Sequence, residues 1–165
     1  MRVRFIRLAT FVLEAGGAGV MFDPMLGHAG TAKPVTNTPN QRRNPLVDLP
    51  LSDEETTALL QEINVVLVTY THVDHWNPRA EDLISKDAPI LCQPEDEEKI
   101  EATGFQQVVP IDRELTWGSL RLMRTDRRAA RVSSDAAWPP TPASWSGRKA
   151  RLFCTLRGIR SGAPR

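Results

Sequence analysis

The stretch NVVLVTYTHVDHW, residues 64–76, joins an apolar run to a compact cluster of polar side chains. The run at 65–68 is rich in valine and does not alternate with polar residues, which is typical of a strand buried on both faces. The cluster after it contains His72, Asp74 and His75. Because open α/β sheets place their ligand sites beyond the carboxyl ends of the strands, this order predicts a functional site where the strand ends.

The three clustered side chains are of the types that bind divalent metals. Neutral imidazole nitrogens and carboxylate oxygens are good ligands for zinc and related ions. A strand end can project such close neighbours into one cavity, so we interpret His72, Asp74 and His75 as a metal site. The alternative is a polar surface loop with solvated histidines. His28 lies in a separate loop and is interpreted as a solvated histidine.

The rest of the first 124 residues alternates between strand and helix patterns. Ser52 and Glu55 have the spacing of a capping box, which predicts a helix that begins after Ser52. The connection 27–51 is rich in proline and asparagine, and loops of that length are functional or disordered. Strands are expected at 3–8, 10–15, 18–22, 64–70, 88–93, 107–111 and 119–124, and helices at 53–63, 78–85 and 94–104. This alternation, after an antiparallel opening, predicts an α/β layered domain.

Composition places the chain among ordinary globular proteins. Its 165 residues are 41% hydrophobic and 25% charged, and they suffice for one domain with a real core. No apolar run approaches the roughly 20 residues that span a bilayer, so we expect no membrane segment. Arg7 and Glu14 interrupt what would be the apolar part of a signal peptide. Cys92 and Cys154 give no disulfide framework, which favours the cytoplasm.

Charge is distributed unevenly along the chain. Residues 125–165 carry nine Lys and Arg against two acidic residues, whereas residues 1–124 carry 12 basic and 18 acidic residues. The pattern of strands and helices stops at 125, and the tail reads as a basic segment of low structure. Such a tail suggests a second class of function, a non-catalytic protein that binds nucleic acid or an anionic surface. The tail has two tryptophans but no recognisable nucleic-acid motif, so we do not favour this alternative.

The motif and its surroundings resemble the metallo-β-lactamase-fold hydrolases, whose signature is His-x-His-x-Asp-His after a buried strand. The matching stretch is VTYTHVDHW at 68–76. VMFDPML at 20–26, NQRRNPLVDLPLS at 40–52 and ILCQPEDEEKIEATGF at 90–105 are similar to small metal-dependent hydrolases related to the sugar-lactone lactonases. The resemblance covers residues 1–124. It implies an αββα sandwich with one or two divalent metals, usually zinc with manganese as an alternative, that activate water to hydrolyse a small-molecule ester, lactone or phosphodiester.

The resemblance also implies roles for individual residues. His72 would bind the first metal, and Asp74 and His75 would belong to the second. Asp74 would also be catalytic, accepting a proton from the attacking water. Asp23 matches an acidic residue that supports the site from behind the metal ligands, and its alternative role is that of a turn residue before proline.

Tyr70 departs from the family pattern because it occupies the position of the first motif histidine. A neutral phenol is a poor ligand near pH 7 unless the metal deprotonates it. Histidine and tyrosine codons can differ by one base, so a point change or a reading error can produce this substitution. The first metal would then lose a ligand, and we expect weak metal binding.

The downstream ligands that the resemblance implies are missing from the chain. A histidine in an HGTGE-like segment, an aspartate in GDT and a final histidine are expected, yet His75 is the last histidine in the sequence. The sequence would then supply residues 1–124 as a partial domain that corresponds to the first half of the sandwich, followed by the tail 125–165. As written, the chain would be truncated and inactive. The alternatives are a degenerate homologue, a relative that only binds partners, and a genuine basic tail.

A frameshift near residues 125–130 would explain the tail. When the third base of each codon is read with the first two of the next, 130–133 permits T-G-E, and Trp138 with Pro139 forces alanine. Phe153 with Cys154 forces leucine, and the codons after it permit a strand ending in GDT. The same offset does not recover the histidine of HGTGE. We therefore interpret the tail as a frameshift product with an uncertain shift point.

Overall fold

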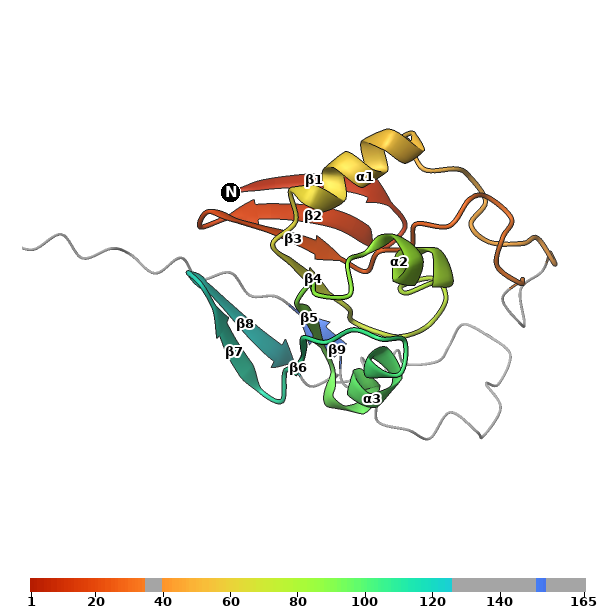
Figure 1. The fold of residues 1–165 in the computed structure, drawn as a ribbon. Helices are drawn as coiled ribbons and strands as arrows, with labels where there is room; N and C mark the ends of the chain where they lie inside the picture. Colours follow the sequence, from red (N-terminus) through yellow and green to blue (C-terminus); the bar gives the residue numbers. More distant parts are fainter. Residues whose placement is uncertain (35–39, 126–150, 154–165) are drawn as a thin grey trace, which may run out of the picture.

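The computed structural model describes residues 1–34, 40–125 and 151–153 (Figure 1). The elements follow one another as β1 (Arg2–Arg7), β2 (Thr10–Ala15), β3 (Ala18–Phe22), α1 (Asp53–Gln61), β4 (Val65–Leu67), α2 (Pro78–Leu83), β5 (Ile90–Cys92), the 3₁₀ helix η1 (Pro94–Asp96), α3 (Glu97–Glu101), β6 (Val108–Pro110), β7 (Glu114–Trp117), β8 (Leu120–Thr125) and β9 (Arg151–Phe153). This confirms the predicted α/β class. The sequence analysis did not predict β7 or β9.

Six strands form one mixed sheet in the order in which they occur in the chain. The first three are an antiparallel meander, and β3, β4, β5 and β6 then run parallel to one another. The turn between β2 and β3 uses Gly16 at φ 59° and Gly17 at φ 81°, in the left-handed region that glycine adopts without steric cost. A separate antiparallel sheet contains β7, β8 and β9. The carboxyl ends of β3, β4 and β5 therefore lie side by side at one edge of the main sheet.

Helices cover one face of the main sheet, and the smaller sheet covers part of the other. Val66 belongs to a core cluster that includes Leu59 of α1 and Ile100 of α3. Its neighbour Val65 belongs to a second cluster, which includes Leu120 of β8. Both valines are almost fully buried, which confirms the prediction that this strand is covered on both faces. The resulting layers match the first half of the predicted αββα sandwich.

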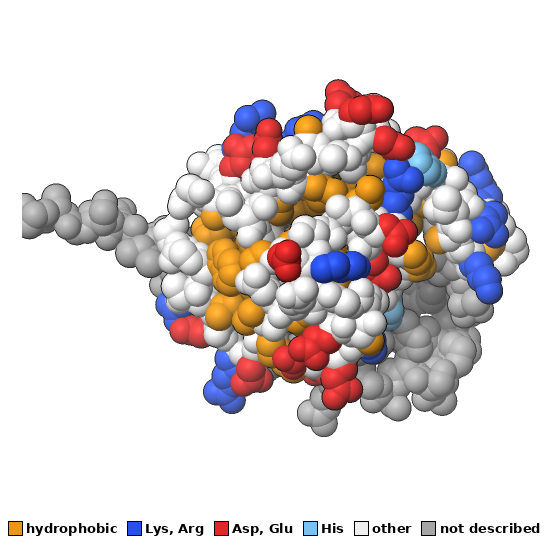
Figure 2. Space-filling model, viewed as in Figure 1, with side chains coloured by type: hydrophobic (Ala, Val, Ile, Leu, Met, Phe, Trp, Pro, Cys, Tyr) orange, Lys and Arg blue, Asp and Glu red, His pale blue; other side chains and the backbone are white. Residues whose placement is uncertain are grey.

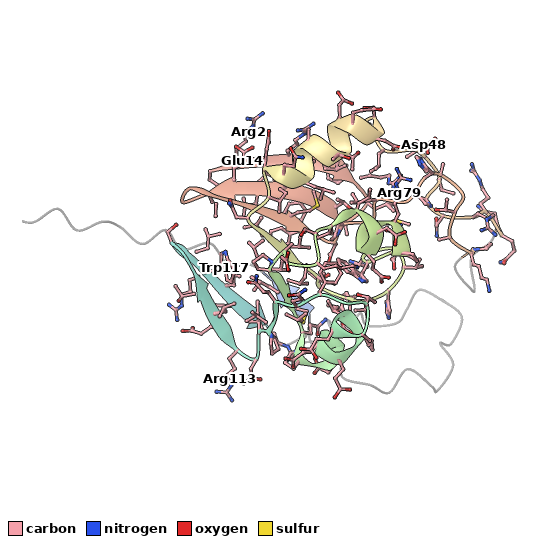
Figure 3. All side chains as sticks on the ribbon, in the orientation of Figure 1. Arg2, Glu14, Asp48, Arg79, Arg113 and Trp117 are labelled. Carbon is pink, nitrogen blue, oxygen red and sulfur yellow. The ribbon has the colours of Figure 1, made fainter. Side chains whose placement is uncertain are left out.

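The edge of the main sheet formed by β1 is less well covered. Val3 and Phe5 of β1 are 56% and 68% exposed. They lie on the same face of the sheet as the residues of β2 that pack against the smaller sheet. Arg2 and Glu14 pair across β1 and β2 at 3.9 Å, and Figure 3 labels both. Figure 2 shows hydrophobic side chains reaching the surface between acidic and basic ones. No helix in the described ranges has the length and apolar character needed to cross a bilayer.

Local sequence signals account for the helix starts. Ser52 accepts from the Glu55 backbone N–H at 3.1 Å, and the Glu55 carboxylate accepts from the Ser52 N–H at 2.7 Å, which confirms the predicted capping box. Asn77 caps α2, with Pro78 at its first turn. The helix predicted over 94–104 begins at Pro94 as predicted, but its first turn is the 3₁₀ helix η1, and α3 ends at Glu101, before the predicted end.

Arg7 holds the described part of the connection 27–51 against the sheet. Its guanidinium is buried and donates to the backbone carbonyls of Met25 at 2.6 Å, Gly27 at 2.7 Å and Val47 at 2.8 Å. Burial lowers the pKa of Arg7, and the nearby Asp48 carboxylate acts in the opposite direction. A cation held by three carbonyls fixes this connection beside the carboxyl ends of the strands.

The predicted basic tail falls almost wholly outside the described residues. Positions 126–150 and 154–165 are not described, and the frameshift interpretation rests on them. Arg151–Phe153 pairs antiparallel with β8.

Candidate functional site

The polar cluster occupies a loop that leaves the carboxyl end of β4. Asp23 directly follows β3, and Gln93 directly follows β5. Because these three parallel strands are neighbours in the sheet, their ends bring the three segments to one place. The position of the loop agrees with the position predicted from the strand and the motif.

Asp23 lies under this loop and binds it through both carboxylate oxygens. Its Oδ1 accepts from the Thr69 N–H at 2.6 Å, and its Oδ2 accepts from the Thr69 hydroxyl at 2.7 Å. The same Oδ2 lies 2.8 Å from Nδ1 of His75. An ionised carboxylate can only accept, so Nδ1 of His75 carries the proton and donates. In the neutral ring, Nε2 then holds the lone pair that a metal or a proton would take.

The backbone at Asp23 also makes a turn. Its φ is 42°, a left-handed conformation that asparagine and aspartate tolerate better than most residues. The Asp23 carbonyl accepts from the Thr10 hydroxyl at 2.6 Å and from the Met25 N–H at 2.8 Å. The residue thus combines the geometry of a turn before Pro24 with a direct contact to His75.

Asp74 and His75 form a pair of donors that could share one cation. Asp74 Oδ2 lies 3.7 Å from His75 Nε2. Two ligands at about 2.1 Å from one zinc ion lie about 3.4 Å apart at a tetrahedral angle, so this spacing fits a partial metal site. Nitrogen and carboxylate oxygen also fit zinc or manganese by donor type.

His72 lies on the other side of the loop, against Tyr70. The two rings stack with their centroids 5.6 Å apart and an interplanar angle of 15°. Tyr70 also meets His75 edge-on at 5.4 Å and 72°. Within the described parts of the chain, no three His, Cys, Asp or Glu side chains converge in a group that could hold a metal. The structure therefore pairs His75 with Asp23 through Nδ1 and with Asp74 through Nε2, and it leaves His72 beside Tyr70.

Sequence analysis missed a set of polar residues on the side of the loop that faces β5. Gln93 donates from its side-chain amide to the Thr69 carbonyl, and the Asp96 carboxylate accepts from the Thr71 hydroxyl at 2.8 Å. A hollow of about 130 Å³ lies here, lined by Tyr70, Thr71, His72, Gln93, Glu95, Asp96 and Lys99. No sequence signal pointed to these contacts, because they depend on β4 and β5 being neighbours in the sheet.

A larger hollow of about 440 Å³ lies at the opposite end of the strands of the main sheet, beside the β2–β3 turn and the end of α1. Its lining includes Gly16 and Gly17 of the turn, Val12 and Ile63. Its lining includes the amino end of β3 but neither the motif nor the carboxyl end of a parallel strand. We therefore place the candidate site at the loop after β4, although the hollow there is smaller.

Comparison with known proteins gives one match to a protein family. Residues 2–129 match the description "Beta-lactamase superfamily domain". The UPF0173 protein YddR of Bacillus subtilis (strain 168) is 31% identical to the chain over 127 residues, which is 76% of this chain and 49% of YddR.

Two solved structures are similar to the whole described fold. A "possible metal-dependent hydrolase" from Veillonella parvula DSM 2008 has a TM-score of 0.77 and 33% identity over 93% of this chain and 58% of its own. An isothiocyanate hydrolase from Delia radicum gut bacteria has a TM-score of 0.75 and 29% identity over 95% of this chain and 59% of its own. The chain thus spans about half to three fifths of the length of these proteins.

Proposed function

We propose that this chain, which belongs to the beta-lactamase superfamily, carries part of the site of a metal-dependent hydrolase that acts on a small-molecule ester, lactone or phosphodiester. A divalent metal, when bound, would act as a Lewis acid and activate water for the hydrolysis. Relatives named as metal-dependent and isothiocyanate hydrolases support the general class. The bond that is cleaved is our proposal.

One observation carries this proposal: a buried carboxylate holds Nδ1 of His75. Histidines that bind metals almost always donate their second ring N–H to a carboxylate or carbonyl, which fixes the tautomer and the ring orientation. Asp23 is only 4% exposed and makes this contact at 2.8 Å. A surface histidine in a polar loop would have no need of such a buried partner.

We assign separate tasks to the residues of the loop. His75 would present Nε2 to the metal, and Asp74 would be the second ligand and the acceptor of a proton from water. His72, which stacks against Tyr70, would bind the first metal. Zinc suits these donors best, with manganese as the alternative. Tyr70 in the position of the first motif histidine would make the affinity low.

We also infer that the tail 125–165 arises from a frameshift and that the chain as written is inactive. The order of the matches T-G-E, alanine, leucine and GDT in one alternative frame supports this inference. Sequencing of the DNA across codons 120–135 tests it. An intact gene with no alternative frame encoding GDT would refute the frameshift.

We also propose that the protein is cytoplasmic. The buried, free Cys92 is compatible with this location.

Metal binding provides the direct test of the hydrolase proposal. We expect wild-type protein to bind Zn²⁺ weakly but saturably in a calorimetric titration, and His75→Ala to lower the affinity at least about tenfold. The matched control is His28→Ala, because His28 lies outside the motif, is exposed and has its Nδ1 3.7 Å from the Asp48 carboxylate. This control should bind as the wild type does. Absence of saturable binding by the wild type, or an equal loss in both variants, would contradict the proposal.

A further inference from the structure

We propose that Gln93 and Asp96, at the end of β5, are positioning residues that hold the site loop from the side opposite to Asp23. This inference rests on the proposed function, because it assigns the two residues to the same metal-binding loop. They would act through Thr69 and Thr71 and would not touch the metal or the substrate.

Gln93 uses its side chain for a contact far away in the sequence. The residue is 4% exposed, and its side-chain amide donates to the Thr69 carbonyl. It stands at the position that precedes η1, yet it makes no side-chain capping bond to that helix. A buried amide is costly unless it is hydrogen-bonded. Its position is therefore explained by the loop that it holds.

The side chain of Asp96 also bonds to the site loop and makes no capping bond to the helix that follows it. It occupies the position before α3, where an aspartate commonly accepts from the backbone of its own helix, but it makes no such bond. Its Oδ1 accepts from the Thr71 hydroxyl at 2.8 Å and from Lys99 Nζ at 2.5 Å. Burial raises the pKa of Asp96, but the hydrogen bonds from Lys99 and Thr71 outweigh this and hold it below its ordinary value. The carboxylate is thus ionised at neutral pH and binds the loop in its stronger, charged form.

The two contacts bracket Tyr70. Thr69 is held by Asp23 through its N–H and hydroxyl and by Gln93 through its carbonyl. Thr71, on the other side of Tyr70, is held by Asp96. The backbone is therefore fixed on both sides of the residue that contacts the rings of both motif histidines. Loss of either anchor would let the loop move relative to Asp23, and with it the His75 ring.

Removing one hydroxyl tests this without removing bulk. Thr71→Val should weaken Zn²⁺ binding about tenfold, in the range known for residues that support metal ligands, and Thr71→Ser should restore it. Thr103→Val is the matched control, since the Thr103 hydroxyl donates to the Ile100 carbonyl at 2.7 Å, away from the loop. Combining Thr71→Val with Asp96→Asn should add little to the loss, because both variants disrupt the same hydrogen-bonded group of Thr71, Asp96 and Lys99.

A readout in metal-free protein separates this proposal from the proposed function. The His75 N–H donates to the His72 carbonyl at 2.9 Å and reports on the order of the loop. Its amide hydrogen exchange should be at least several times faster in Thr71→Val than in wild type, and unchanged in Thr103→Val. If the wild type binds no zinc but exchange changes as described, the hydrolase proposal fails and the positioning role stands. Unchanged exchange, or equal effects of both valine variants, would overturn the positioning role.

Discussion

The two sides of the site loop are built from the same kinds of groups but reach different parts of the motif. On the β3 side, Asp23 binds Thr69 and also the His75 ring directly. On the β5 side, Asp96 binds Thr71 and Lys99. Here His72 is exposed and rests against Tyr70. One histidine thus has a buried carboxylate as a hydrogen-bond partner, and the other stacks against an aromatic ring.

This difference indicates which half of the motif would hold its ligand more rigidly in the proposed metal site. A carboxylate that fixes Nδ1 removes the rotational freedom of the imidazole before any ion arrives. A stacked pair of aromatic rings is worth about 0.5–1.5 kcal/mol and fixes orientation less strictly. In the proposed site, the Asp74–His75 side would therefore be the better organised for a metal.

The largest effect, on both stability and zinc affinity, is expected when the hydrogen bonds of Asp23 on the β3 side are disrupted. Asp23→Asn keeps the size and the tolerance for the left-handed backbone, but it replaces one acceptor oxygen by an N–H₂ donor that faces Thr69 and His75. Loss of hydrogen bonds to a buried charge should lower the free energy of unfolding by about 2–3 kcal/mol. Zinc affinity should fall about 10–100-fold. Urea unfolding and a zinc titration measure the two effects.

The control for this variant is Asp112→Asn, at an exposed position. Substitutions at such sites are usually within about 0.5 kcal/mol of the wild type. If Asp23→Asn were equally mild, the Asp23–His75 contact would contribute no stability, and the contrast between the two sides of the loop would disappear.

A smaller effect, a gain in zinc affinity, is expected when a histidine is introduced at position 70 beside His72. Tyr70→His places an imidazole where the family signature has its first histidine, close to the ring of His72. Zinc affinity should rise about tenfold if the two imidazoles can bind one ion together. Loss of the Tyr70 ring contacts should lower the unfolding free energy by about 1 kcal/mol. Calorimetry and urea unfolding of the same preparation distinguish the two changes.

The matched variant is Tyr70→Phe, which retains the aromatic ring and adds no ligand. Its zinc affinity should show none of the gain expected for Tyr70→His. A gain with phenylalanine as large as that with histidine would mean that the hydroxyl obstructs the site and that the imidazole adds nothing.

The sequence predicted the scaffold of this site better than its contacts. The valine run and the capping box at Ser52 are local signals, and each was confirmed. The roles of Gln93 and Asp96 depend on which strand lies next to β4, and neither residue has a local signature for such a role. Asp96 even occupies a position where a bond to its own helix would be the ordinary expectation. Long-range partners of this kind follow from the sheet order, which the chain reveals only once folded.

The smallest expected effect is the pH dependence of the β5 side. The pKa of Asp96 is lowered in the folded protein, so its carboxylate stabilises the fold above the unfolded-state pKa of about 4. That contribution is lost as the pH falls below about 4 and through the folded-state pKa. Wild type should therefore exceed Asp96→Asn in unfolding free energy at pH 6, and the difference should shrink steadily below pH 4. Urea unfolding at a series of pH values measures it. A difference that stayed constant from pH 6 to pH 2.5 would show that the charge of Asp96 does not hold Thr71 in place, and the two sides of the loop would then differ even more than the contacts suggest.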